Sequence, residues 1–271
     1  DHVYVYADYA TQEPCIAAYL SNDQNMIEAY NSDDMYLYAP IKAGILPNDA
    51  ASEYIKSDKK KFKQERELYK RALLASMYGQ KEGSLSIALN ISFDHAAKIL
   101  ADITSSYETY FRWVDRKVSQ GARDGYMKTK FGWRRNLTYG EKINKRSLFN
   151  FMCQGHGSEM LRLALIDLTE KKFEVNALVH DGILLHIKRK SLRKKISQIE
   201  KIMTDAAKIV LGNKCKMRVD FKVIRGNFKQ DEIEQKKYER IFSKLKKVSV
   251  PKIGRVCTQN NAPGQSSYMY S

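Results

Sequence analysis

Residues 175–187 read VNALVHDGILLHI and hold the clearest structural signal in the chain. Two apolar runs are separated there by the pair Asp181-Gly182. Asp-Gly between apolar runs is a strong signal for a β-hairpin, because both residues tolerate the backbone conformations of a tight turn. The sequence therefore predicts two antiparallel strands, with Asp181 in the turn that joins them.

A further strand is predicted close to the N-terminus, where side chains alternate over residues 3–8. Alternation with a period of two places successive side chains on opposite faces of a strand. One face carries Val3, Val5 and Ala7, and the other carries Tyr4, Tyr6 and Asp8. Residues 216–224 alternate in the same way. Asp8 and Asp181 thus belong to short, mostly apolar strands, which we expect to share one sheet.

Helical periodicity fills most of the remaining chain. The predicted helical segments are 13–30, 61–77, 93–122, 145–169 and 191–211. A polar loop is expected over 48–60 and a small hairpin over 125–132. After Phe228 we expect a charged helical segment to about Lys247, and then a frayed end rich in Asn, Gly, Ser and Pro.

The composition is that of a folded, strongly basic protein. The chain has 271 residues, 43% of them hydrophobic and 29% charged, with a formal net charge of +16. Such a charge favours a polyanionic partner, most often nucleic acid, the alternative being a generally basic, solvated surface. The 4 cysteines form no CxxC pair, which excludes a zinc ribbon and a disulfide-stapled secreted scaffold and fits a reducing compartment. No run of about 18 apolar residues is present, so we expect no membrane partner.

Asp8 and Asp181 form the first candidate site. Carboxylates brought together from separate strands are suitable ligands for two Mg²⁺ ions, which prefer oxygen and bridge to substrate phosphates. Two such ions can stabilise the attacking and leaving oxygens of a phosphoryl displacement. The alternative for Asp181 is a simple turn-forming role.

A stripe along the helix predicted over 61–77 forms the second candidate site. Its members recur at every fourth residue and therefore share one face: Arg66, Lys70, Leu74 and Tyr78. Cations followed by an apolar and an aromatic residue suit a triphosphate at one end and a base at the other. The alternative is a solvated basic face above a core stripe.

A third candidate site follows in the helix predicted over 145–169. Arg146, Asn150 and Gln154 have the same spacing and are residue types that read the minor groove of nucleic acid. Gly155 and Gly157 would allow close approach, and each costs roughly 1 kcal/mol inside a helix, which argues for a specific reason. The alternative is an ordinary helix surface.

Five segments, in this order, resemble the motifs of DNA polymerase family A, the group of the bacterial polymerase I enzymes. Residues 8–13, DYATQE, are similar to D-Y-S-Q-I-E, and residues 66–79 to R-xxx-K-xxx-F-xxx-Y-G. Residues 125–135 are similar to G-Y-V-x-T-x-x-G-R-R-R, residues 146–155 to R-xxx-N-xxx-Q-G, and residues 179–182 to V-H-D-E. The resemblance covers about residues 3–228.

The resemblance implies an α+β fold in which an antiparallel palm sheet carries both aspartates and helices form a fingers subdomain. The implied parts are palm over 1–23, fingers over 24–139, palm again over 140–228, and a basic C-terminal extension over 229–271. The thumb region would lie upstream of this chain. A bacterial or phage-encoded cytoplasmic protein is expected, with an organellar one as a further option.

The resemblance also implies residue roles. Asp8, Asp181 and Lys70 would be catalytic, and Asp8 and Asp181 would hold two Mg²⁺ ions. The residues expected to bind the incoming dNTP are Glu13, Tyr36, Arg66, Lys70, Leu74 and Tyr78, with Glu13 excluding a ribose 2′-OH. The residues expected to contact primer–template DNA are Arg146, Asn150, Gln154 and His180.

Three positions depart from the family pattern. Leu74 stands where the family has an aromatic residue, Tyr36 where it has a His, and Gly182 where it has an acidic residue. The first two bear on nucleotide affinity and sugar selectivity, whereas both main carboxylates are retained.

The implied function is template-directed addition of deoxynucleotides to a primer 3′-hydroxyl by a two-metal mechanism, in DNA replication or repair. One alternative is a remnant that binds nucleic acid without catalysis. Another is a specialised repair or lesion-bypass polymerase, with which the changes at Tyr36 and Leu74 are compatible.

Overall fold

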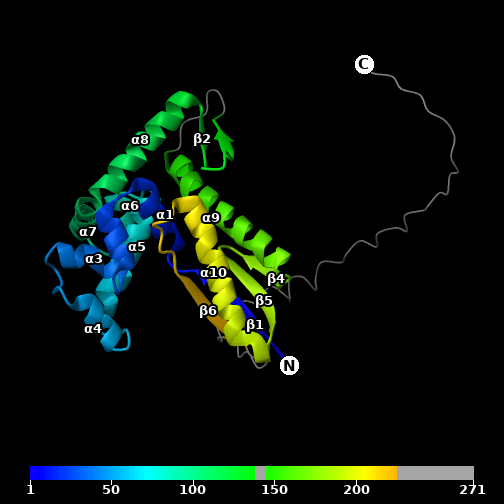
Figure 1. Cartoon of the computed structure of the whole chain (residues 1–271). Coiled ribbons are helices and arrows are strands. Elements are labelled where there is room, and N and C mark those ends of the chain that lie inside the picture. Colours follow the sequence, from blue (N-terminus) through cyan, green and yellow to red (C-terminus); the bar gives the residue numbers. More distant parts are fainter. Residues whose placement is uncertain (138–144, 225–271) are drawn as a thin grey trace, which may run out of the picture. The chain divides into compact units, whose positions relative to one another are not determined.

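The computed structural model describes residues 1–137 and 145–224, and of residues 145–149 it describes the backbone only. A four-stranded antiparallel sheet has the strand order β4-β5-β1-β6, so the N-terminal strand β1, blue in Figure 1, lies between strands from the second half of the chain. Its strands are β1 (His2–Tyr9), β4 (Glu174–Val179), β5 (Gly182–Lys188) and β6 (Val219–Ile224). Sheet and helices alternate irregularly along the chain, so the predicted α+β class is confirmed.

The register of the sheet fixes which side chains share a face. Asp8 on β1 lies directly opposite Gly182 on β5 and opposite Asp220 on β6. Val5 and Ala7 are fully buried, as the alternation of this strand predicted. One face of the sheet is therefore apolar and covered, and the other carries the polar side chains.

Two long helices lie side by side along the sheet, α9 (Lys145–Glu170) and α10 (Leu192–Leu211). The buried residues of α10 recur at helical spacing and include Ile199, Met203 and Val210. The Tyr9 hydroxyl donates to the carbonyl oxygen of Met203 at 3.1 Å, which ties the end of β1 to this helix. These contacts hold the strand that carries Asp8 against the core.

Eight helices occupy the first half of the chain: α1 (Gln12–Ser21), α2 (Gln24–Asn31), α3 (Met35–Lys42), α4 (Ala50–Lys56), α5 (Lys63–Met77), α6 (Glu82–Leu89), α7 (Phe93–Ser106) and α8 (Glu108–Asp124). The helical segment predicted over 13–30 breaks at Asp23, whose carboxylate accepts from Met26 N and from Tyr110 N, both at 2.9 Å. One buried side chain thus caps α2 and fixes α8 beside it. The segment predicted over 93–122 breaks at the buried Tyr107.

The expectation of a polar loop over 48–60 was wrong in part, because α4 lies within it. Ala50 and Tyr54 pack with Leu37 and Leu46 in a small cluster separate from the main core. Only two residues of α4 are buried, and a pattern this sparse gives little periodicity to read. The small hairpin is present, as β2 (Tyr126–Lys128) paired with β3 (Arg134–Asn136).

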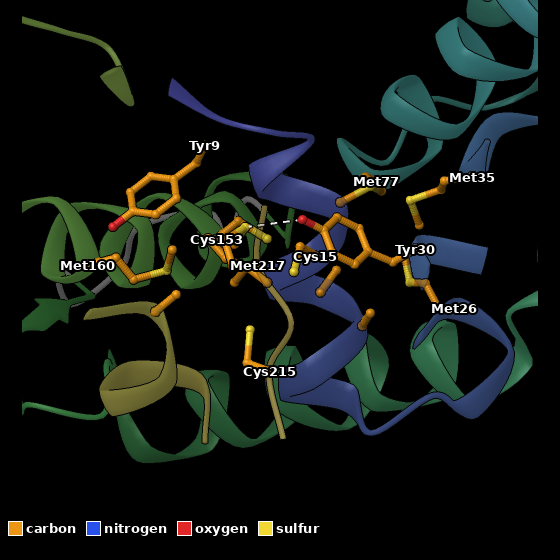
Figure 2. Close-up of a cluster of buried hydrophobic side chains, with 14 of the residues drawn as sticks. Tyr9, Cys15, Met26, Tyr30, Met35, Met77, Cys153, Met160, Cys215 and Met217 are labelled. Atoms are coloured by element: carbon orange, nitrogen blue, oxygen red, sulfur yellow. Dashed lines mark hydrogen bonds between the residues drawn. The ribbon is translucent and has the colours of Figure 1, made fainter. Parts of the chain in front are cut away.

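The main core is rich in sulfur where the end of β1 meets α1, α2 and α9 (Figure 2). The Tyr30 hydroxyl approaches the Met217 sulfur at 3.4 Å and donates to the Ala10 carbonyl oxygen at 3.1 Å. Cys15, Cys153 and Cys215 are buried and not in disulfides. Within the described residues, no helix is long and apolar enough to cross a membrane. The charged segment predicted after Phe228 lies outside the described residues.

Gly155 and Gly157 on α9 serve internal packing, which corrects the expectation that they admit a nucleic-acid groove. A Cβ at Gly155 would lie 2.6 Å from the Thr129 Cγ2 atom, beyond the end of β2. A Cβ at Gly157 would lie 2.8 Å from the Gln12 side-chain oxygen on α1. Both glycines let neighbouring segments approach the helix backbone, so their cost in helix propensity has a structural reason.

We predict that Gly155→Ala lowers the melting temperature. The added methyl group would overpack the contact with the buried Thr129, which typically costs about 1–3 kcal/mol and exceeds the gain in helix propensity. Gly83 is a matched control inside α6, because nothing lies within 4 Å of its Cβ position. Gly83→Ala should leave the melting temperature unchanged or raise it, and equal effects of the two substitutions would contradict the packing role.

Candidate active site

Asp8 and Asp181 are brought together by the pairing of two neighbouring strands. Asp8 is the second-last residue of β1, and Asp181 precedes Gly182, the residue opposite Asp8 on β5. Asp181 lies in the predicted turn between β4 and β5. The two strands share one sheet, as the sequence predicted, and both carboxylates lie at the same end of the β1–β5 pair.

The Asp8 carboxylate is in an environment that disfavours its charge. Burial, a hydrogen bond with Asp181, and the charges of Asp181 and Asp220 raise the pKa of Asp8 from 3.8 to about 7, against a smaller opposing effect of His180. Its Oδ1 atom is buried without a hydrogen-bond partner. A bound cation would supply the missing partner and favour the ionised form.

His180 adjoins the pair. Its φ of 57° lies in the left-handed region, an uncommon conformation for a residue with a side chain. Its Nδ1 atom lies 3.0 Å from Asp181 Oδ1, and this hydrogen bond raises the pKa of His180 above its ordinary value. The rest of the His180 side chain is exposed to solvent, so it can contact a bound molecule.

Asp220 is a third carboxylate that sequence reasoning did not single out. It lies directly opposite Asp8 on β6, and its charge contributes to the raised pKa of Asp8. The alternation over 216–224 placed Asp220 on the polar face of a strand. Which residue of β1 it would face depends on a register that the sequence does not encode locally.

The donor set fits a divalent cation held partly by substrate. Among the described residues no group of three or more His, Cys, Asp and Glu side chains is arranged to hold a metal. Mg²⁺ is commonly bound by one or two carboxylates together with water and phosphate oxygens. Asp8, with its orphaned buried oxygen, and Asp181 meet that requirement.

Glu13, in the first turn of α1, joins two other segments of the chain. Its Oε1 atom accepts from the Tyr78 hydroxyl and from Gln154 Nε2, each at 2.5 Å. Tyr78 ends α5 and Gln154 lies in the middle of α9. Burial, followed by the hydrogen bond to Glu13 and its charge, raises the pKa of Tyr78, so its hydroxyl remains a donor. The structure thus unites three residues that the sequence placed in separate motifs.

Arg66 on α5 is held among acidic and aromatic side chains. Its Nε atom lies 2.7 Å from Asp34 Oδ2, and its guanidinium lies over the Tyr36 ring at 5.0 Å and the Tyr54 ring at 5.2 Å. Lys70 Nζ lies 5.6 Å from the centre of the Tyr36 ring. Tyr36, Arg66 and Lys70 are therefore grouped. Asp34 was not expected in this group.

The remaining predicted residues have differing surroundings. Leu74 is half-buried against the main core, one turn before Tyr78. The Asn150 Oδ1 atom is buried without a hydrogen-bond partner. The Arg146 side chain lies outside the described residues, so its expected contacts stay a prediction.

Comparison with known proteins gives a consistent result. The family model described as DNA polymerase family A matches residues 1–228. The thermostable DNA polymerase I of Thermus aquaticus is 25% identical over 190 residues, which cover 66% of this chain and 22% of that protein. DNA polymerase I of Bacillus subtilis is 23% identical over 229 residues, covering 79% of this chain and 24% of that protein.

A solved structure shares the fold. The POL domain of Pol1 from M. smegmatis, in complex with DNA primer-template and dNTP, matches with a TM-score of 0.70 and 21% identity. The match covers 83% of this chain and 40% of that one. The present chain thus spans less than a quarter of the Thermus aquaticus protein, and less than half of the M. smegmatis chain.

We predict a pH-dependent stability that originates at Asp8. Its pKa of about 7 in the folded chain exceeds the ordinary 3.8, so the folded state binds this proton more tightly than the unfolded state. Without metal, stability should therefore fall as pH rises from about 4 to about 7. Asp8→Asn removes that loss. In EDTA, the melting temperature of this variant relative to the wild type should therefore rise from pH 5 to pH 8.

Asp205→Asn is the matched control, because Asp205 pairs with Lys201 and Lys208 and its pKa is lowered. Asp205 stays ionised from pH 5 to pH 8. The difference in melting temperature between Asp205→Asn and the wild type should therefore be the same at both pH values. The same behaviour for Asp8→Asn would contradict the raised pKa of Asp8.

Proposed function

The chain belongs to DNA polymerase family A, and from that membership we propose that it is the catalytic part of a template-directed DNA polymerase. Its partners would be primer–template DNA and deoxynucleoside triphosphates. The observation that carries the proposal is the meeting of Asp8, on β1, with Asp181, in the turn before β5, together with a buried Asp8 oxygen that has no partner. That arrangement suits a site that acquires cations together with a phosphorylated substrate.

Asp8 and Asp181 would hold two Mg²⁺ ions. When bound, such ions lower the pKa of the primer 3′-hydroxyl and neutralise charge on the leaving pyrophosphate. Asp8 would contribute its unpartnered oxygen, and its ionised form would be favoured by the cations. Asp181 would contribute from the turn, where His180 orients its carboxylate by a hydrogen bond.

Arg66 and Lys70 would bind the triphosphate, with Lys70 acting beside the reacting phosphate. A guanidinium can bind phosphate oxygens through two parallel N–H donors at once. Asp34 holds the Arg66 guanidinium in the described state. A triphosphate would therefore compete with Asp34, and Tyr36 would keep the Arg66 guanidinium in place through its ring.

Glu13 would border the sugar of the incoming nucleotide, with Leu74 on the other side and Tyr78 near the base. The two hydrogen bonds to Glu13 Oε1 restrict its rotamers. A fixed carboxylate excludes a 2′-OH better than a mobile one, because it cannot move aside without losing both bonds. Sugar selection would thus depend on Tyr78 and Gln154 as well as on Glu13.

Primer–template DNA would lie along α9 and the turn between β4 and β5. The Asn150 Oδ1 atom is buried without a partner, so it would accept from DNA once the side chain turns outward, and Gln154 lies one turn further on the same helix face. Arg146 would extend this row, and His180 would contact the primer terminus. The palm would comprise 1–23 and 140–228, the fingers 24–139, and a basic extension 229–271.

We predict that Asp8→Asn and Asp181→Asn each reduce primer extension with Mg²⁺ by at least about a thousandfold, because each removes a cation ligand. Binding of primer–template, measured by fluorescence anisotropy, should change by less than about threefold. Asp205→Asn serves as the control and should extend normally. Extension near the wild-type rate by either site variant would contradict the assignment. A full-length protein that binds DNA but does not extend primers would be a non-catalytic remnant.

We predict that Glu13→Ala raises the ratio of ribonucleotide to deoxynucleotide incorporation by at least about tenfold, or roughly 1.4 kcal/mol. Single-nucleotide kinetics of both substrates measure this ratio. Glu28→Ala is a matched control, because Glu28 also accepts from a tyrosine, Tyr38, at 3.2 Å, but on α2. If Glu13→Ala lowers the melting temperature without changing the ratio, Glu13 serves only the fold.

A further inference from the structure

Tyr6 occupies the space that a side chain at position 182 would need. Tyr6 and Asp8 are two residues apart on β1, and their side chains therefore share the polar face of the sheet. Gly182 on β5 lies opposite Asp8, and Leu184 lies opposite Tyr6. A Cβ atom built on Gly182 would fall on the ring and hydroxyl of Tyr6. The ring thus lies across β5 at the residue that has no side chain.

The Tyr6 hydroxyl also contacts β4, the strand beyond β5. It donates to the carbonyl oxygen of Val179 at 3.2 Å. Val179 is the last residue of β4, and β4 is separated from β1 by β5. One side chain of β1 therefore reaches across a whole strand and holds the end of the strand beyond it.

The segment that Tyr6 holds has little packing of its own. β4 is an edge strand, and Leu178 and Val179 are 47% and 53% exposed. Its register with β5 is interrupted between Val175 and Ala177. The turn that follows contains His180 in the left-handed region and then Asp181. A turn at the end of an exposed, irregular edge strand needs an external contact to stay in one position.

We propose that Tyr6 is a positioning residue that fixes the β4–β5 turn, and with it Asp181, relative to Asp8. Gly182 is then required because any larger residue would displace the Tyr6 ring. This explains in physical terms why glycine follows Asp181 in this chain. The inference rests on the proposed function only in assigning a catalytic purpose to Asp181. The mechanical link between Tyr6 and the turn stands on the contacts alone.

A double-substitution cycle tests the link. Gly182→Ala should lower kcat for primer extension at least about tenfold in the wild-type background, because the methyl group displaces the ring. In the Tyr6→Ala background the same change should alter kcat by less than about twofold, because the ring is no longer present to be displaced. KM for dNTP should change little in either case. An equal loss in both backgrounds would overturn the proposal.

A second measurement does not depend on polymerase activity. Hydrogen–deuterium exchange of the segment 176–183 should be faster in Tyr6→Phe, Tyr6→Ala and Gly182→Ala than in the wild-type chain. Tyr4→Phe is the matched control, since Tyr4 shares the face but lies against His186, with ring centres 5.0 Å apart. Exchange of that segment at the wild-type rate in all three variants would overturn the proposal.

A third measurement connects the turn to cation binding. Mn²⁺ titration of the protein alone, followed by electron paramagnetic resonance, should give at least about threefold weaker binding for Gly182→Ala, and little further change when Tyr6→Ala is added. A loosened turn with unchanged Mn²⁺ affinity would overturn the positioning of Asp181. If the full-length protein fails to extend primers, the proposed function fails, while the exchange result still decides whether Tyr6 holds the turn.

Discussion

Holding Asp8 beside Asp181 at the end of a largely buried strand costs the folded chain stability, because burial and neighbouring charges disfavour the ionised carboxylate. The rest of the fold offsets that cost. The apolar face of β1 packs on the core, and Tyr9 binds the backbone of α10. Strain and unmet polar groups are typical of functional sites that a rigid scaffold supports. The unpartnered Asp8 oxygen is such a group, and a cation would satisfy it.

A second junction links the helices to the sheet. Glu13 lies a few residues after Asp8, and its carboxylate binds the end of α5 and the middle of α9. A movement of α5 would break or strain the bond between Tyr78 and Glu13. The position of the helix that carries Arg66 and Lys70 is thereby coupled to the segment that carries Asp8. Glu13 thus physically connects the helix with the proposed triphosphate-binding residues to the segment with the carboxylate pair.

Local patterns predicted the elements well, because alternation, helical spacing and the Asp-Gly turn are properties of neighbouring residues. The contacts between elements were harder to predict from the sequence. The opposition of Asp8 and Asp220 depends on strand register, and the pairing of Asp34 with Arg66 on the packing of α3 against α5. Gly155 was noticed for its cost in a helix, but its partner Thr129 lies far away in sequence. The family resemblance gave expected roles for residues, whereas the contact between Gly182 and the Tyr6 ring became visible only in the structure.

In the proposed site, Asp8 and Asp181 would act as one cation-binding pair. Mn²⁺ binding to the chain at pH 8, without DNA or nucleotide, tests it most directly when the wild type is compared with Asp8→Asn, Asp181→Asn and Asp205→Asn. We expect the first two variants each to weaken binding by at least about tenfold, and Asp205→Asn to bind like the wild type. Equal affinity in all four proteins would contradict it.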